Sequence, residues 1–252
     1  MRHIYFHLLC LVVVFFASTG EVLCQTLNDK PADSFPNKWV AGTVVDDADI
    51  KTYGIGKCFV AEVISDEVFS RMRNKSYKNG CPVKIERLRY LKVLHRNADG
   101  KTQLGELVCN VTIADKLLRI FRKLYDADYK IEKMCLIDDF NADDERSMAA
   151  NNTSCFNYRV VSGTKTVSKH GYGLAIDLNP RYNPYVHTLN GVRVVEPANG
   201  KDYAFNRANR KDIPYKIDTN DLAYKLFIAE GFSWGGSWRT MKDYQHFDYR
   251  RQ

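Results

Sequence analysis

SKHGYGLAIDLNP, from Ser168 to Pro180, is the segment that says most about this chain. His170 and Asp177 stand seven residues apart in it. The apolar run from Leu174 to Leu178 predicts a short strand, which places the histidine on the loop that leads into the strand and the aspartate at an inward-facing position. The two side chains can then converge on one metal ion.

A second segment, DYQHFDY from Asp243 to Tyr249, supplies what the first one lacks. His246 offers a third ligand, and Asp243 offers a carboxylate that need not bind the metal. Three protein ligands leave a coordination position open for water, and a free carboxylate nearby can act as a base, which is typical of hydrolytic zinc sites. The sequence therefore predicts a zinc ion bound by His170, Asp177 and His246.

The two motifs, S-x-H-x-x-G-x-A-x-D at Ser168–Asp177 and D-x-x-H at Asp243–His246, resemble those of a zinc peptidase family. The family contains D-Ala-D-Ala carboxypeptidases, D-Ala-D-Ala dipeptidases and L-alanyl-D-glutamate endopeptidases, and the resemblance covers roughly the C-terminal two-thirds of the chain. It implies zinc as the cofactor, stem peptides of bacterial peptidoglycan as the substrate and Asp243 as the general base. An aspartate at this position favours the endopeptidase branch over the dipeptidase-like branches, where the base is a glutamate.

The resemblance also implies an arginine, from a strand near the metal, that holds the substrate or the developing oxyanion. Arg159, in the strand-like run Cys155–Val161, is the first candidate for this catalytic role and Arg146 is the second. The chain departs from the expected S-G-Y-R-S form of the motif. The alternative is that Arg159 is a surface residue paired with the acidic loop that follows Ile137.

The pattern of the whole chain predicts an α+β fold, with a small, mainly antiparallel sheet, flanking helices and the zinc site on the sheet face. Residues 89–96 and 103–108 flank the turn sequence Asn97–Gly100, which is typical of a hairpin. Helices are expected from Ser65 to the Asn79-Gly80 turn, after Asn110, and from Thr219 or Asn220 to Gly231.

Less regular expectations concern the segments between these elements. Residues 134–137 are expected to form a short strand, and residues 179–215, which contain four prolines, a long excursion over the site. Tyr182 and Tyr185 in that excursion either line the substrate groove or pack the loop onto the body. Trp234 and Trp238 either wall the pocket or belong to the core.

The N-terminus resembles a secretory signal peptide over residues 1–24, with an apolar run from Ile4 to Phe16 that is too short to span a bilayer comfortably. Export to the periplasm or the exterior is therefore expected. Lipid attachment at Cys24 is the competing interpretation, which the lack of a small residue just before this cysteine disfavours. Residues 25–84 are expected to form an N-terminal extension and residues 85–252 the zinc peptidase domain.

Charge and cysteine content narrow the class of protein. The formal charge of +7 is spread without a Lys/Arg block, and no nucleic-acid motif occurs, so a nucleic-acid partner is not expected. A membrane span is not expected either, because the apolar run at the N-terminus is too short. The sequence gives no prediction of the oligomeric state. In an oxidising compartment Cys58 and Cys81 are the first choice for a disulfide, whereas Cys109 and Cys155 suit small buried hydrophobic positions.

The remaining polar candidates have structural interpretations. His95 and His187 lack motif context and are assigned structural roles, whereas Asp248, on the same side of a strand as His246, is a candidate to orient an imidazole. The expected function is a zinc metallopeptidase, a hydrolase of the L-Ala-D-Glu endopeptidase or D-Ala-D-Ala carboxypeptidase type. The alternative is a non-catalytic zinc-containing module that binds cell-wall peptides, which would require a disabled base or ligand.

Overall fold

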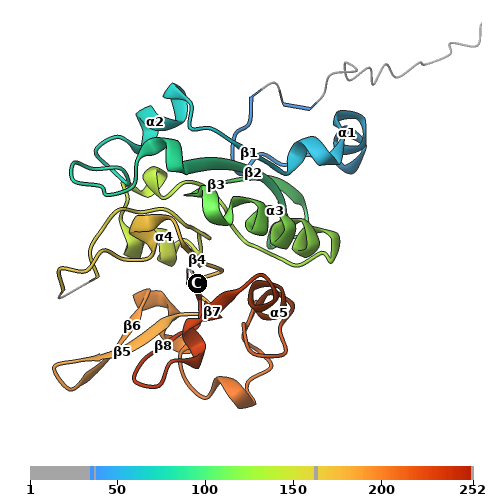
Figure 1. Cartoon of the computed structure of the whole chain (residues 1–252). Helices are drawn as coiled ribbons and strands as arrows, with labels where there is room; N and C mark the ends of the chain where they lie inside the picture. Colours follow the sequence, from blue (N-terminus) through green and yellow to red (C-terminus); the bar gives the residue numbers. More distant parts are fainter. Residues whose placement is uncertain (1–34, 37, 162–163, 251–252) are drawn as a thin grey trace, which may run out of the picture. The chain divides into compact units, whose positions relative to one another are not determined.

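The computed structural model describes residues 35–36, 38–161 and 164–250 (Figure 1). The predicted signal segment, residues 1–24, lies outside the described residues, as does the start of the predicted extension. The described chain is α+β, with several helices and small antiparallel sheets, as predicted. Instead of the one small sheet that the sequence predicted, the described residues form three sheets of three strands each.

The first sheet contains the predicted hairpin. Its strands are β1 (Val60–Glu62), β2 (Leu88–Arg96) and β3 (Thr102–Asn110), in the order β1-β2-β3. Helix α3 (Val111–Asp126) begins directly after β3 because the Asn110 side chain accepts a hydrogen bond from the Thr112 backbone N–H at 3.0 Å. One face of α3 packs against the sheet, where Leu91, Leu107 and Leu117 are fully buried.

Helix α2 (Asp66–Met72) covers the other face of this sheet. Ser65 caps its first turn, as predicted, by accepting a hydrogen bond from the Val68 N–H at 3.2 Å. The helix ends at Met72, well before the predicted Asn79-Gly80 turn. The chain leaves the helical path because Asn74 is left-handed, with a φ of 63°, and because Ser76 is tied to the Asp138 carboxylate by two hydrogen bonds of 3.0 Å.

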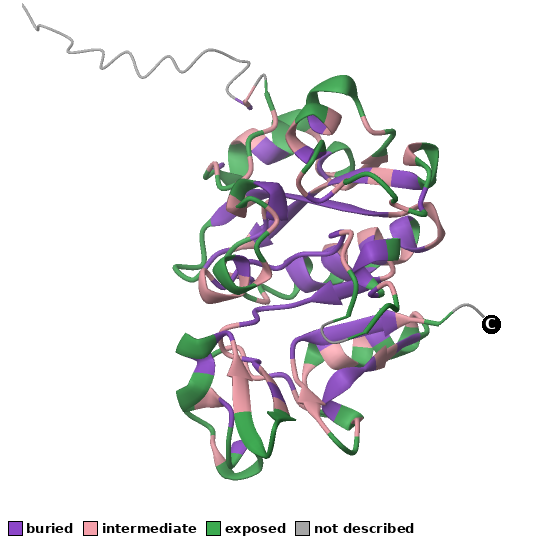
Figure 2. Ribbon diagram, turned by 90° about the vertical axis from the view of Figure 1, so that its left-hand side faces the viewer, coloured by how far each residue is buried: buried purple, intermediate pink, exposed green. Residues whose placement is uncertain are grey.

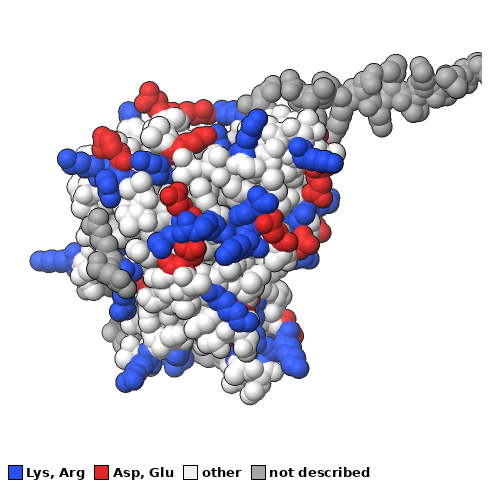
Figure 3. Space-filling view, turned by 45° about the vertical axis from the view of Figure 1, so that its right-hand side comes forward, with Lys and Arg blue, Asp and Glu red and all other residues white. Residues whose placement is uncertain are grey.

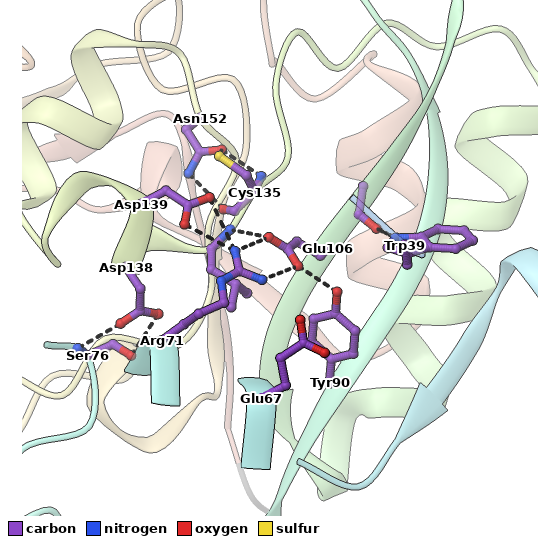
Figure 4. Close-up of polar contacts among 12 residues, drawn as sticks. Trp39, Glu67, Arg71, Ser76, Tyr90, Glu106, Cys135, Asp138, Asp139 and Asn152 are labelled. Carbon is purple, nitrogen blue, oxygen red and sulfur yellow. Dashed lines mark hydrogen bonds and ion pairs between the residues drawn. The ribbon is translucent and has the colours of Figure 1, made fainter. Parts of the chain in front are cut away.

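A buried ion pair attaches α2 to the sheet (Figure 4). Glu106 on β3 is 1% exposed, and Arg71 on α2 donates to its two oxygens at 2.9 and 2.5 Å. The Tyr90 hydroxyl donates to the same carboxylate at 2.5 Å, and Asp139 accepts from the outer side of the guanidinium at 3.1 Å. The hydrogen bonds to Glu106 raise the pKa of Arg71 above its ordinary value.

The second sheet carries the predicted metal ligands. Its strands are β4 (Ala175–Asp177), β9 (His246–Tyr249) and β7 (Phe232–Trp234), in the order β4-β9-β7. One face packs on helix α5 (Leu222–Ala229), where the Phe227 and Phe247 rings stack at 4.3 Å. Because side chains alternate along a strand, the other face carries Asp177 and His246.

The third sheet lies where the sequence predicted an irregular excursion. Strands β5 (Tyr185–Leu189) and β6 (Val192–Glu196) form a hairpin, and β8 (Lys242–Asp243) pairs with β5, in the order β6-β5-β8. Asn190 and Gly191 make the turn with φ angles of 50° and 80°, a conformation that this residue pair favours. Much of this hairpin is only partly buried (Figure 2).

The remaining elements are short and connect these sheets. The helices are α1 (Asp47–Tyr53) and α4 (Asp144–Ala149), and the 3-10 turns are η1 (Ile55–Cys58), η2 (Ile85–Arg87), η3 (Ile137–Phe140), η4 (His170–Tyr172), η5 (Ala198–Tyr203), η6 (Arg207–Asn209) and η7 (Gly235–Ser237). The strands predicted at 134–137 and 155–161 are wrong, since those segments form only isolated bridges or none. Helix α5 begins at Leu222, after its cap Asp221, two or three residues later than predicted.

The predicted bridge between Cys58 and Cys81 is wrong. All five cysteines of the described residues are free thiols. Cys58 packs in a cluster with Leu94 and Leu104, whereas Cys81 packs against a separate cluster. Cys109 and Cys155 lie in the main core, as the alternative interpretation expected.

The surface agrees with the even charge distribution of the sequence. On the face drawn in Figure 3, basic and acidic side chains lie interspersed. Within the described residues, none of the helices combines the length and the apolar character that a membrane span requires.

Candidate metal centre

His170, Asp177 and His246 meet in one buried cluster. Asp177 on β4 and His246 on β9 are paired in the second sheet, and η4 brings His170 over them. His170 Nε2 lies 3.2 Å from Asp177 Oδ2 and 3.2 Å from His246 Nδ1, and His246 Nδ1 lies 3.1 Å from Asp177 Oδ1. The three residues are 4%, 8% and 8% exposed.

A backbone carbonyl fixes the orientation of His170. Its Nδ1 lies 2.7 Å from the carbonyl oxygen of Cys155. The carbonyl can only accept, so Nδ1 carries the proton and Nε2 directs its lone pair at the cluster. Metal-bound histidines commonly have this outer partner.

The donor set fits a zinc ion. In a tetrahedral zinc site with bonds of about 2.0–2.1 Å, neighbouring donor atoms lie roughly 3.3 Å apart. The three distances here are 3.1, 3.2 and 3.2 Å. Two imidazole nitrogens and one carboxylate oxygen form the kind of three-ligand set that leaves room for a water molecule. Among the described residues, these three are the cluster that could hold a metal ion.

Electrostatics within the cluster favour a charged carboxylate. Burial opposes ionisation of Asp177, but the charges and hydrogen bonds of His170 and His246 outweigh it and hold the pKa of Asp177 well below its ordinary value. Burial also lowers the pKa of His170, and the neighbouring Asp177 carboxylate more than compensates, so that this pKa is raised. The anionic carboxylate is the form that a metal ion binds.

Asp243 lies beside this cluster on a different sheet. Strand β8 approaches η7 at Gly235, where a Cβ atom would stand 2.6 Å from the Asp243 carbonyl oxygen and 3.3 Å from the His246 Cβ. Asp243 Oδ1 is buried and has no hydrogen-bond partner among the described residues. Burial raises the pKa of Asp243 to about 7, and the nearby Asp177 charge also raises it, against the lowering effects of His246 and Arg159.

Arg159 lies close enough to act on this site by its charge. Its positive charge lowers the pKa of both His170 and Asp243. Its Nε also forms an ion pair with Asp144 on α4, and the Asn157 amide donates to the other oxygen of that carboxylate at 3.1 Å. Arg159 is therefore paired with the acidic segment, as the alternative interpretation expected, and it also lies near the candidate metal centre.

The other sequence candidates separate in the structure. Trp238 lies with its ring 5.5 Å from the His246 ring, whereas Trp234 belongs to the core and donates to the Tyr244 carbonyl at 2.9 Å. Tyr182 packs on Tyr203 and Tyr215, while Tyr185 is paired with Asp243 in the third sheet.

The two histidines assigned structural roles, His95 and His187, lie away from the metal cluster, and Asp248 lies on the strand that carries His246. His95 is buried in the first sheet, and His187 lies on the β5–β6 hairpin. Asp248 faces the same side of β9 as His246, but its Oδ1 is buried without a hydrogen-bond partner among the described residues. The observed partner of an imidazole is instead the Cys155 carbonyl, a backbone group for which the sequence holds no signal.

Comparison with known proteins bears on the same residues. A family model described as D-alanyl-D-alanine carboxypeptidase matches residues 162–249, a range that contains the three clustered residues and Asp243. The match supports the family of zinc cell-wall peptidases. The description of the matched family is that of a peptidase, which is a class of hydrolase. Arg146 and Arg159 lie before the matched range. Searches among curated proteins and among solved structures found no significant match.

Proposed function

We propose that the protein is an exported zinc metallopeptidase that hydrolyses peptide bonds in the stem peptides of bacterial peptidoglycan. The observation that carries the proposal is the buried cluster of His170, Asp177 and His246, with donor atoms 3.1–3.2 Å apart. The family match over residues 162–249 supports the same class of activity. Export is proposed because residues 1–24 resemble a secretory signal and because the substrate lies outside the cytoplasm.

Each residue has a defined task in this proposal. His170 Nε2, the Asp177 carboxylate and His246 would hold the zinc ion, which would supply Lewis acidity and lower the pKa of a water molecule. Asp243 takes up a proton at its carboxylate and returns it to the nitrogen of the leaving amine. The Cys155 carbonyl keeps the His170 ring in the orientation that this requires. Arg159 binds a carboxylate or carbonyl oxygen of the substrate through its planar guanidinium.

The identity of the general base, Asp243, indicates which peptide bond the enzyme hydrolyses. An aspartate at position 243 favours hydrolysis of the L-Ala-D-Glu bond over the D-Ala-D-Ala bond, because aspartate occurs as the base in several endopeptidases of the family that the sequence resembles. Both bonds occur in one stem peptide, so a single substrate reports on both.

Product analysis tests the proposal. Purified protein, with its zinc content measured, is incubated with defined muropeptides, and the products are identified by mass spectrometry. We expect one zinc per chain and cleavage at one of the two bonds. His170→Ala and His246→Ala should lose both metal and activity, because two protein ligands hold zinc poorly. Intact muropeptides after incubation with the zinc-loaded protein would refute the enzymatic function and favour a binding module.

A further inference from the structure

One face of the β5–β6 hairpin continues directly from the proposed base. Tyr185 is paired with Asp243 on one side and with Glu196 on the other. Paired residues in an antiparallel sheet project from the same face. Asp243, Tyr185 and Glu196 therefore form one row across the third sheet, and the carboxylate at the inner end of this row is the one beside the metal cluster.

The same face extends outward along the hairpin. The rings of Tyr185 and His187 are stacked, with centroids 4.6 Å apart and planes inclined by 12°. His187 Nε2 lies 3.3 Å from Glu196 Oε1. Farther out, Leu189 and Val192 are 57% and 65% exposed. We call this face of the hairpin the hairpin strip; its residues are Tyr185, His187, Leu189, Val192, Val194 and Glu196.

The two faces of the hairpin differ in their surroundings. Val186, on the opposite face, is 2% exposed, and Arg193 on that face lies over the Phe205 ring at 5.6 Å. On the strip, the Glu196 side chain is 44% exposed and the apolar side chains at the tip are open to solvent. The strip is thus a partly apolar surface with an accessible carboxylate, continuous with the candidate active site.

We propose that the hairpin strip binds the part of the substrate next to the scissile bond and selects a side chain with an aliphatic stem and a terminal ammonium group. The stacked Tyr185 and His187 rings offer apolar surface to the methylene groups of such a stem. The Glu196 carboxylate accepts charge-assisted hydrogen bonds from the ammonium group. This inference rests on the proposed function, since it assigns the substrate class of the same site.

Two observations support a cationic partner. The row places a second carboxylate, Glu196, two strand spacings or about 10 Å from Asp243. Asp243 and Glu196 flank Tyr185 on one face of the sheet, so their negative charges repel each other across one surface. A bound cation offsets this repulsion. An extended peptide covers about 10 Å in roughly three residues, so a residue two positions from the scissile bond can reach Glu196 when its side chain is long.

A pair of matched peptides tests the inference. One is a stem pentapeptide with both an L-Ala-D-Glu and a D-Ala-D-Ala bond and a central lysine, and the other replaces lysine by norleucine, which keeps the stem and removes the ammonium group. We expect the wild-type enzyme to cleave the lysine peptide with about tenfold higher kcat/KM. Glu196→Gln should reduce this ratio to near one. Glu196→Lys should reverse the preference towards a third peptide with a central glutamate.

Matched controls come from the opposite face of the same hairpin. Thr188→Ala and Arg193→Gln change neighbouring side chains that point away from the strip, so the lysine-to-norleucine ratio should stay at its wild-type value. Circular dichroism and zinc content establish that each variant is folded and loaded. His187→Ala provides a second strip variant, which should lower kcat/KM for both peptides, because both keep the aliphatic stem that packs on the stacked rings.

The outcomes separate the two levels of the proposal. Equal cleavage of both peptides by the wild-type enzyme, or an undiminished ratio in Glu196→Gln, would overturn the strip assignment while leaving the peptidase function in place. Cleavage of neither peptide by the zinc-loaded wild-type protein would overturn the proposed function and the strip assignment together.

Discussion

Asp243 and Asp177 are two carboxylates close to one metal centre, and they have opposite environments. Asp177 is hydrogen-bonded to an imidazole at 3.1 Å, whereas Asp243 Oδ1 has no partner among the described residues. A carboxylate that binds a metal needs a low pKa, whereas a general base needs a pKa nearer to the working pH. The pKa of Asp177 is lowered and that of Asp243 is raised, which agrees with these two roles.

Asparagine substitutions at these positions should therefore separate metal binding from chemistry. We expect Asp243→Asn to keep its zinc and its fold and to lose activity by about 10²-fold or more, because general acid–base assistance is removed. Asp177→Asn should lose zinc. Metal analysis and muropeptide cleavage of both variants check this, and a fully active Asp243→Asn enzyme would exclude the proposed mechanism.

Arg159 can be tested by a conservative change. If its guanidinium binds the substrate, Arg159→Lys should lower kcat/KM without changing the zinc content, because lysine lacks the planar fork of donors. Asp144→Asn, which removes the partner of Arg159 on α4, serves as the comparison variant. Wild-type kinetics for Arg159→Lys would return this residue to a structural role beside Asp144.

At the level of single elements, helix α2 depends on one buried charge. Glu106 accepts hydrogen bonds from Arg71 and Tyr90 and is 1% exposed. Glu106→Gln should lower the free energy of unfolding by about 1.5–3 kcal/mol, the scale of a hydrogen bond to a charged group, because it leaves the partly buried Arg71 without its main counter-charge. Urea denaturation measures this. The matched control is Glu67→Gln, which removes an exposed partner of Lys38 and should leave the unfolding midpoint unchanged.

The elements that the sequence predicts well are those with local signals. The β2–β3 hairpin follows from the turn Asn97–Gly100, and α3 follows from its cap at Asn110 and its apolar spacing. The end of α2 depends instead on Asp138, which is distant in sequence and holds Ser76. The β5–β6 hairpin had a local signal at Asn190-Gly191, which the many prolines and tyrosines around it obscured.

The candidate site divides in the same way. His170, Asp177, Asp243 and His246 are recognisable from motif spacing, because the members of each motif lie on one short strand and on the turn or strand next to it along the chain. Two other contacts join segments that carry no shared motif. The Cys155 carbonyl lies against the His170 ring, and Asp144 is paired with Arg159. Such contacts leave no periodic pattern in the sequence.

For the whole molecule, a buried histidine links stability to pH. His95 is 1% exposed, its Nδ1 lies 2.7 Å from the Ile131 carbonyl oxygen, and its Nε2 has no partner among the described residues. Burial lowers its pKa to about 4 from an ordinary value of 6.5. The unfolded chain therefore takes up a proton before the folded chain does, and stability is lost as the pH falls from about 6.5 towards 4.

The size of this effect can be measured by difference. The free energy of unfolding should fall by at most about 1.4 kcal/mol per pH unit through His95 in this range. Urea denaturation of the zinc-loaded wild-type protein and of His95→Gln, each at pH 7 and pH 5, isolates the contribution of this residue. The variant should show the weaker pH dependence, and equal slopes for the two proteins would contradict the assignment.

The base and the metal ligands are carried by different sheets, and only Tyr244 and Gln245 separate the strand of the base, β8, from the strand of His246, β9, along the chain. Asp243 takes its position from pairing with the hairpin strand β5, whereas Asp177 and His246 are paired with each other. Insertions or deletions in the β5–β6 hairpin, whether they arise in evolution or by design, can therefore move Asp243 and the hairpin strip together. The ligand geometry is inherited unchanged through such remodelling, so new specificities can arise without a new metal site.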